Sequence, residues 1–222
     1  MIKKLIKKFI FPGAGPYKVL LGPSKGMLIN YDINNRFLHL TGFYEREIYR
    51  FLLKGMKKAN LLIDVGANDG YYVLAFLKSG KRVIACEPGN SSEEIIKNAA
   101  LNNFYVSDNF ILEKKLVGEG NSFENFVSIP NLISSQKKPF FFLVDIDGGE
   151  LELLNTTKFD FDFKDTYWLI ETHSKMLENE CRKYLISKGL KVTIIKNAWW
   201  RIFIPENRPT DHNRWLFAEY KY

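Results

Sequence analysis

Cysteine is almost absent from this 222-residue sequence, since only Cys86 and Cys181 occur. Neither belongs to a Cys-x-x-Cys pair or to a Cys/His spacing typical of a zinc site. The chain therefore lacks the marks of a disulfide framework, and a reducing compartment is favoured. The N-terminal apolar residues are interrupted by Lys7 and Lys8, and no small-residue cleavage site of a secretory signal follows, so we expect a cytoplasmic protein.

Long apolar runs and repetitive segments are also missing. A run such as Phe140 to Val144 is far shorter than the ~20 residues needed to span a bilayer. Hydrophobic residues make up 46% and charged residues 26% of the chain, a composition typical of globular proteins. The length is enough for one packed domain and too short for two ordinary ones. We therefore predict a single globular unit without a transmembrane helix.

Positive charge is concentrated at the N-terminus. The net charge is +7, and residues 1–11 hold four lysines and no acid. Apolar residues recur there at helical spacing, which predicts a basic amphipathic tail over 1–13 that ends at Pro12-Gly13. Two uses stay open at this point: docking on this domain or a partner chain, and peripheral contact of residues 1–11 with an anionic membrane surface.

From residue 60 onward, apolar strand-like runs alternate with helix-like segments that follow glycine turns. This alternation predicts a parallel sheet covered by helices. The last two strand-like runs are joined by a long loop, 197–213, instead of a helix, which predicts an antiparallel pair. We therefore predict an α/β, Rossmann-like domain over 60–222 with a mostly parallel sheet. Its expected strands are Leu61–Val65, Arg82–Cys86, Phe140–Ile146, Tyr167–Ile170, Lys191–Ile195 and Trp215–Tyr220.

Residues 14–59 predict a small N-terminal β/α extension. Short alternating segments with turn residues between 17 and 40 predict two or three small antiparallel strands. Thr41 is placed as the N-cap of a helix over about 44–58 with an apolar stripe. Further along the chain, Ser91 and Glu94 have the spacing of a capping box, and Gly80 and Gly189 stand where helices end.

The segment from Asp64 to Gly70 carries the strongest functional signal. It follows a buried strand and precedes a helix, and its glycines at 66 and 70 let the backbone approach a ligand. The next strand ends with Glu87, 21 residues beyond Gly66, where a carboxylate can accept hydrogen bonds from both hydroxyls of a ribose. The two elements together predict a nucleotide-type site.

Two nucleotide cofactors compete for this site. A dinucleotide motif requires glycine where Asn68 stands, and Asp69 would place negative charge near the pyrophosphate. A cationic sulfonium ligand instead tolerates acids at Asp64 and Asp69. The charge pattern therefore selects S-adenosylmethionine over NAD; a tight turn without a ligand is the structural alternative.

These residues give the chain a resemblance to the FkbM-type family of S-adenosylmethionine-dependent methyltransferases. The family signature I-D-V-G-A-N-x-G-x-Y matches Ile63 to Tyr72, and Glu87-Pro88 follows. The later motifs D-V-E-G-x-E and L-I-E-x-H are similar to Asp145–Glu150 and Leu169–His173. The resemblance implies a class I methyltransferase fold and a set of cofactor-binding residues, namely Asp64, Gly66, Asn68, Gly70, Tyr71, Glu87 and Pro88.

The chain also departs from the family pattern. Leu143 replaces a lysine that usually precedes the D-V-E-G-x-E motif, and Asp147 replaces its central glutamate. These positions concern the acceptor side of the site more than cofactor binding. The family implies O-methylation of hydroxyl groups on sugars, polyketides or other small metabolites, so we expect a small-molecule or glycan hydroxyl acceptor.

Polar residues at the ends of two predicted strands are candidates for acceptor chemistry. Asp145, Glu171 and His173 are the predicted catalytic residues, because open α/β sheets bind ligands at this edge. We assign His173 as the base and Glu171, two residues earlier, as the acid that orients its ring. A structural role for His173 is the alternative. We assign no metal, although these residues and Asp147 have the donor types of a metal site; Asp147 and Glu150 have helix capping as another role.

Several function classes fit the sequence less well. No Asn/Asp-Pro-Pro-Tyr segment or Pro-Cys pair typical of base methylation is present, which argues against a nucleic-acid substrate. We expect the loop 197–213, with Trp200-Arg201 and Arg208–Trp215 in or beside it, to cover the acceptor. The non-enzymatic alternative is a Rossmann-like scaffold tethered to a membrane or partner by the basic tail. The sequence does not specify an oligomeric state.

Overall fold

A seven-stranded sheet forms the centre of the protein. The computed structural model describes residues 15–31, 33–118, 125–158, 161–202 and 212–220. The strand order is β10-β11-β9-β8-β3-β4-β5, and the five strands from β9 to β5 are parallel. The strands are β3 (Leu61–Val65), β4 (Arg82–Cys86), β5 (Phe110–Glu113), β8 (Phe140–Val144), β9 (Thr166–Thr172), β10 (Leu190–Ile195) and β11 (Arg214–Tyr220).

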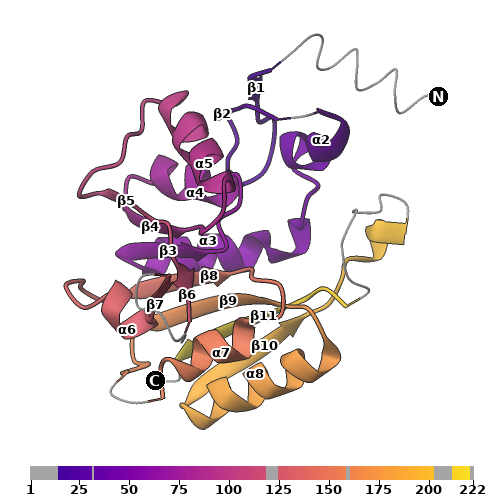
Figure 1. Cartoon of the computed structure of the whole chain (residues 1–222). Helices are drawn as coiled ribbons and strands as arrows, with labels where there is room; N and C mark the ends of the chain where they lie inside the picture. Colours follow the sequence, from indigo (N-terminus) through magenta and orange to yellow (C-terminus); the bar gives the residue numbers. More distant parts are fainter. Residues whose placement is uncertain (1–14, 32, 119–124, 159–160, 203–211, 221–222) are drawn as a thin grey trace.

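Helices cover both faces of this sheet (Figure 1). On one face lie α3 (Tyr49–Lys58), α4 (Tyr71–Lys78) and α5 (Ser91–Ala100), and on the other α6 (Ile129–Leu132), α7 (Glu150–Asn155) and α8 (Lys175–Ser187). Alternate residues of β8 face the two cores: Phe141 packs on the first face, and Phe140 and Phe142 on the second. Burial on both faces explains the uninterrupted apolar strand sequences.

The predicted fold class is confirmed by this architecture. The bounds of β3 and β4 match the predicted strands, and β10 pairs antiparallel with β11 as expected. In addition, β11 pairs antiparallel with β9, so it lies between two strands that precede it in the chain. The carboxyl ends of β3, β4 and β8 consequently meet at one edge of the sheet.

The prediction for the N-terminal extension was partly wrong. Only two two-residue strands form there, β1 (Tyr17–Lys18) and β2 (Leu28–Ile29), and they pair antiparallel. Residues Ile33–Thr41 form a helix, α2, where a further strand was expected. Phe37 and Leu40 are three residues apart and share a helix face, and Leu40 is fully buried in the core. Burial of this helix face in the core therefore determines the local structure, although Asn34-Asn35 favours a turn.

Thr41 does not cap the next helix. It is the last residue of α2, and its hydroxyl donates back to the carbonyl of Phe37 at 2.9 Å. The expected single helix is divided into a 3-10 turn, η1 (Arg46–Ile48), and α3, and Glu45 before it adopts a left-handed φ of 48°. The apolar stripe is nevertheless confirmed, since Ile48 and Leu52 are fully buried and Met56 is nearly so.

The predictions for helix C-termini were confirmed, whereas the predicted N-terminal capping box was wrong. Gly80 and Gly189 end α4 and α8 with φ of 71° and 83°, as predicted. The capping box was wrong: Ser91 is the first residue of α5 and not its cap, and Glu94 pairs with Lys97 at 2.7 Å. The sequence also gave no indication of the small parallel pair β6 (Leu116–Val117) and β7 (Phe126–Val127).

No helix in the described part of the chain has the length and apolar character required to cross a membrane. The basic tail over 1–13 lies outside the described residues, and so do both of its proposed uses.

Candidate functional site

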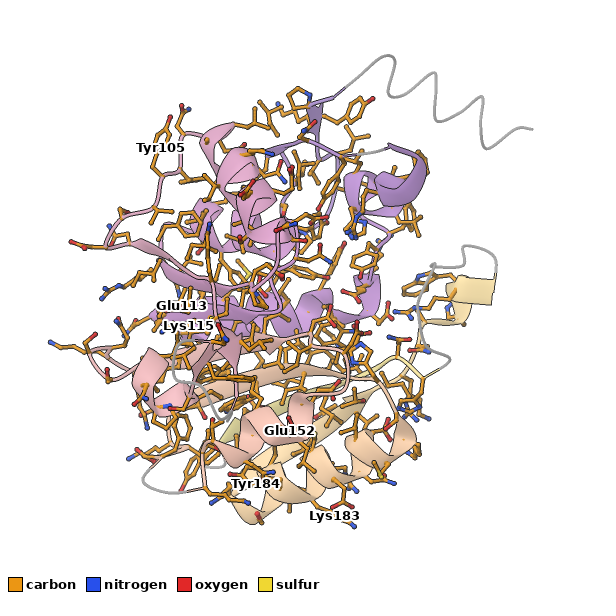
Figure 2. The ribbon with its side chains drawn as sticks, viewed as in Figure 1. Tyr105, Glu113, Lys115, Glu152, Lys183 and Tyr184 are labelled. Atoms are coloured by element: carbon orange, nitrogen blue, oxygen red, sulfur yellow. The ribbon has the colours of Figure 1, made fainter. Side chains whose placement is uncertain are left out.

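A cleft of about 750 Å³ opens at the carboxyl ends of β3, β4, β8 and β9. This volume lies within the ~300–1,000 Å³ typical of small-molecule sites. The segment around β6 and β7 forms one wall, and Arg36 of α2 and Tyr44 contribute to another. Figure 2 labels two lining residues, Lys115 beside β6 and Glu152 on α7.

The glycine loop after β3 packs against the backbone that follows β8. Gly66 has a φ of 82°, and a Cβ at this position would lie 1.9 Å from the carbonyl oxygen of Asp145. We expected the missing side chain to make room for a ligand; in the structure the backbone of Asp145 uses that room. Gly70 has a φ of 89° and its absent Cβ faces Ile95 of α5.

Glu87 lines the cleft at the end of β4, next to Pro88. Its Oε2 accepts a hydrogen bond from the Asn68 amide at 2.8 Å, and its Oε1 accepts from the Gly89 amide at 3.2 Å. A carboxylate offers about four lone-pair sites, so two acceptor positions stay available for ribose hydroxyls. The structure thus brings Gly66, Asn68, Glu87 and Pro88 together, as the motifs predicted.

Asp64, Gly70 and Tyr71 are not among the described residues that line the cleft. Tyr71 is buried, and its hydroxyl lies 3.5 Å from that of Tyr49. Asp69 is also engaged elsewhere: it forms an ion pair with Arg36 at 2.9 Å. The expected attraction of a cationic ligand to Asp69 is therefore offset by Arg36.

Asp64 is buried behind the loop, at 2% exposure, and its Oδ2 has no hydrogen-bond partner in the described part of the structure. Burial, together with the charges of Glu87 and Asp69, raises its pKa to about 8. The folded protein therefore holds this proton over a range in which the unfolded chain has lost it.

We expect this group to make stability fall as the pH rises from about 4 to about 8, because the folded state binds more protons than the unfolded chain in that window. Asp64→Asn removes the ionisation and should flatten the decline. Urea unfolding at pH 5, 6.5 and 8 measures it. A wild-type slope that persists in Asp64→Asn would show that other groups cause the decline.

Carboxylates surround His173, which lines the same cleft. Its Nε2 lies 3.1 Å from Asp147 Oδ1, 3.6 Å from Asp145 Oδ1 and 3.8 Å from Glu171 Oε2. Its Nδ1 lies 2.5 Å from Oε1 of Glu150. The predicted trio of Asp145, Glu171 and His173 is therefore brought together.

The residue that orients the ring is Glu150, which corrects the assignment to Glu171. Glu150 is the first residue of α7 and is fully buried, and it makes no helix cap. His173 directly follows the last residue of β9, and its ring lies against α7. Nδ1 of the ring contacts Glu150, whereas Glu171 lies nearer to Nε2. Burial lowers the pKa of His173, but the hydrogen bond with Glu150 and the nearby carboxylate charges outweigh it and raise the pKa overall.

Asn213 is a site residue that the sequence analysis missed. It lines the cleft just before β11, and its side-chain amide donates to Glu171 Oε1 at 3.3 Å. No motif marks this asparagine, because it is brought beside Glu171 only by the pairing of β11 with β9.

The long loop before β11 is attached at two described points. Arg201, in the 3-10 turn η2 (Trp199–Ile202), pairs with the nearly buried Glu47. At the other end, Arg214 Nε lies 3.0 Å from the buried Glu178 of α8. Residues 203–211 lie outside the described part of the chain, so the expectation that the loop covers the acceptor stays a prediction.

The described lining of the cleft is predominantly acidic. Five acids stand against two permanently cationic side chains, Arg36 and Lys115. The acids are Glu87, Asp145, Asp147, Glu152 and Glu171. Such a lining favours a ligand with positive charge.

Comparison with solved structures identifies the fold. A human methyltransferase 10 domain containing protein has a TM-score of 0.57 and 16% identity, with 89% of each chain covered. Methyltransferase FkbM from Methylobacillus flagellatus has a TM-score of 0.55 and 17% identity, covering 72% of this chain and 43% of that one. An O-methyltransferase from Bacillus cereus in complex with SAH has a TM-score of 0.53 and 14% identity, covering 80% and 81%.

These neighbours are diverse methyltransferases, and at such low identity they establish the class I methyltransferase fold alone. The FkbM-type resemblance is thus supported as one of several. The sequence matches no protein-family model and no curated protein.

Proposed function

We propose that this protein transfers a methyl group from S-adenosylmethionine to a hydroxyl oxygen of a sugar or another small metabolite. One observation carries the proposal: the glycine loop with Glu87 and the His173 cluster line the same acidic cleft. The first group suits the ribose of a nucleoside, and the second suits an acceptor hydroxyl. The fold is one that supports methyl transfer in its structural neighbours.

For this reaction the protein mainly has to position the acceptor and remove its proton. The acceptor oxygen attacks the sulfonium methyl in line, so an O–CH₃ bond forms as the S–CH₃ bond breaks, and the hydroxyl proton must leave. Asp145, Glu171 and His173 are assigned to activation of that hydroxyl, since they face the cleft together. Glu150 positions the ring through Nδ1, which leaves Nε2 as the nitrogen directed at the acceptor side.

The charge of the cleft supports the sulfonium cofactor. A dinucleotide would bring a pyrophosphate dianion into a lining with an excess of acids, whereas S-adenosylmethionine carries positive charge at its sulfur. The acids that favour a cationic cofactor line the cleft, whereas Asp64 and Asp69 are not among its described lining residues.

Calorimetry with S-adenosylmethionine and its demethylated product tests the cofactor assignment. We expect wild-type binding of both, and Glu87→Ala should weaken it by about 1.5–3 kcal/mol, the size of hydrogen bonds to a charged group. Glu113→Ala is the matched control: Glu113 ends the neighbouring strand β5 and is not among the described lining residues, so its affinity should stay near wild type.

Two outcomes would contradict the proposal at different levels. Wild-type affinity in Glu87→Ala would refute the ribose assignment. An absence of binding at millimolar ligand would favour the scaffold alternative over an enzyme. Once binding is established, a screen of hydroxylated metabolites and glycans, with the demethylated cofactor as the measured product, identifies the acceptor.

A further inference from the structure

We propose that Asp145, Glu171 and His173 bind one divalent cation, of the Mg²⁺ or Mn²⁺ type, at the acceptor end of the cleft. Each residue offers one ligand atom, and these atoms all lie within 4.8 Å of one another. The cation site stands on its own geometry; its use in activating the acceptor rests on the proposed function.

The separations of the ligand atoms match a cation better than direct hydrogen bonds. Nε2 of His173 lies 3.6 Å from Asp145 Oδ1 and 3.8 Å from Glu171 Oε2, beyond hydrogen-bonding distance. Ligands about 2.1 Å from an octahedral ion lie about 3 Å apart when adjacent and about 4.2 Å apart when opposite. The two separations from Nε2 fall within this range, and all three atoms lie within 4.8 Å of one another, so small side-chain rotations would let them contact one cation. The carboxylate of Asp147, 3.1 Å from Nε2, is the one at hydrogen-bonding distance from this nitrogen.

A second set of residues holds these ligands in place. Glu150 is fully buried and accepts the Nδ1 proton of His173 at 2.5 Å, which leaves the lone pair of Nε2 directed toward the carboxylates. Asn213 donates to Oε1 of Glu171 at 3.3 Å and so leaves Oε2 facing the ring. A carboxylate behind a ligating histidine is the usual outer partner of metal sites in proteins.

The two central ligands are also shielded from water. The side chains of His173 and Glu171 are 6% and 3% exposed, and Glu150 behind the ring has no exposed surface. Clusters of exposed acids are common without an ion, but buried ones require compensating charge. Two of the four carboxylates that approach this imidazole, those of Glu150 and Glu171, are buried.

The donor set points to a hard cation. Two carboxylates and one imidazole suit Mg²⁺ or Mn²⁺, and the two cysteines, Cys86 and Cys181, are not part of the cluster. Three protein ligands leave coordination positions for water and for oxygens of the acceptor. We therefore expect acceptors that present two neighbouring oxygens, such as a vicinal diol.

The cation would lower the pKa of the acceptor hydroxyl bound to it. The carboxylate of Asp147, which is 78% exposed and 3.1 Å from Nε2, is placed to take that proton and release it to water. The oxygen then forms the O–CH₃ bond as the S–CH₃ bond breaks, and the cofactor leaves as the neutral thioether. In this mechanism His173 acts as a ligand and not as the base.

Titration of the metal-free protein with MnCl₂, followed by electron paramagnetic resonance of free Mn²⁺, tests the site without any activity assay. We expect one Mn²⁺ per wild-type chain and at least tenfold weaker binding in Glu171→Gln. Glu152→Gln, a change in an exposed acid of the same cleft outside the cluster, should bind within about twofold of wild type. No binding at millimolar MnCl₂, or equal weakening in both variants, would overturn the proposal.

Activity measurements then test whether methyl transfer requires the cation. If the protein binds S-adenosylmethionine and turns over equally after exhaustive chelation, the role of the cation in activating the acceptor is refuted and His173 is the direct base. If Mn²⁺ binds but S-adenosylmethionine does not, the cation site stands and the proposed function fails. Loss of turnover on chelation, restored by Mn²⁺ or Mg²⁺ and not by Ca²⁺ or NaCl, is the expected result.

Discussion

Gly66→Ala is expected to lower the free energy of unfolding by about 2–5 kcal/mol, the combined size of a left-handed non-glycine residue and an overpacked contact. The new Cβ would lie 1.9 Å from the carbonyl oxygen of Asp145, and that oxygen belongs to backbone that cannot rotate away. Relief requires the ends of β3 and β8 to separate. Since Gly66 and Asp145 both line the cleft, cofactor affinity should fall as well. Urea unfolding and calorimetry measure the two effects.

Gly26→Ala is the control that separates the cost of a left-handed backbone conformation from the cost of a steric clash. Gly26 has a similar φ of 91°, and a Cβ there would meet nothing within 4 Å. This variant should lose only the conformational part, about 1 kcal/mol, and bind the cofactor normally. If Gly66→Ala were no less stable than Gly26→Ala, the close approach of the Asp145 carbonyl would not constrain the loop.

His173→Ala is expected to cut turnover by about 10²–10⁴-fold while cofactor affinity stays near wild type. The reason is geometric: Nε2 faces the carboxylates of Asp145, Asp147 and Glu171. Glu87, the assigned ribose ligand, instead accepts hydrogen bonds from backbone amides of the adjacent loops, and it is not among the described contacts of His173. The loss is expected whether the ring takes the proton itself or binds a cation. Steady-state rates and calorimetry on the same preparation give both quantities.

Two further variants assign the cause of that loss. Glu150→Gln keeps the shape of the residue behind the ring but weakens the hydrogen bond at Nδ1, so turnover should fall about 10–100-fold, the size typical of outer partners of a ligating histidine. His212→Ala changes a histidine that is not among the described lining residues, and its rate should stay near wild type. A folded His173→Ala protein with full turnover would give the ring a purely structural role.

Local sequence patterns were sufficient for six of the seven strands of the sheet and for much of the cleft, but they missed β5 (Phe110–Glu113). The bounds of β3 and β4 were predicted because their largely apolar runs are buried and end before Gly66 and Glu87. Glu87 was located because parallel strands bring their carboxyl ends to one edge, so a strand-end acid must lie near the glycine loop. The trio Asp145, Glu171 and His173 follows from the same rule.

Pairings between distant segments decided the rest. Whether residues 33–41 form a strand or a helix depended on which face the core buried, and Leu40 shows that it was a helical face. The orienting acid of His173 is 23 residues away on α7, and the carbonyl that requires Gly66 belongs to Asp145, the residue directly after the neighbouring strand β8. Asn213 reaches Glu171 only because β11 inserts beside β9. Such contacts depend on strand order and helix placement, and neither can be read from the spacing of apolar residues along the sequence.

The sequence by itself therefore determined the fold class and the residue types at the sheet edge. The tertiary structure decided which of these residues contact and position one another.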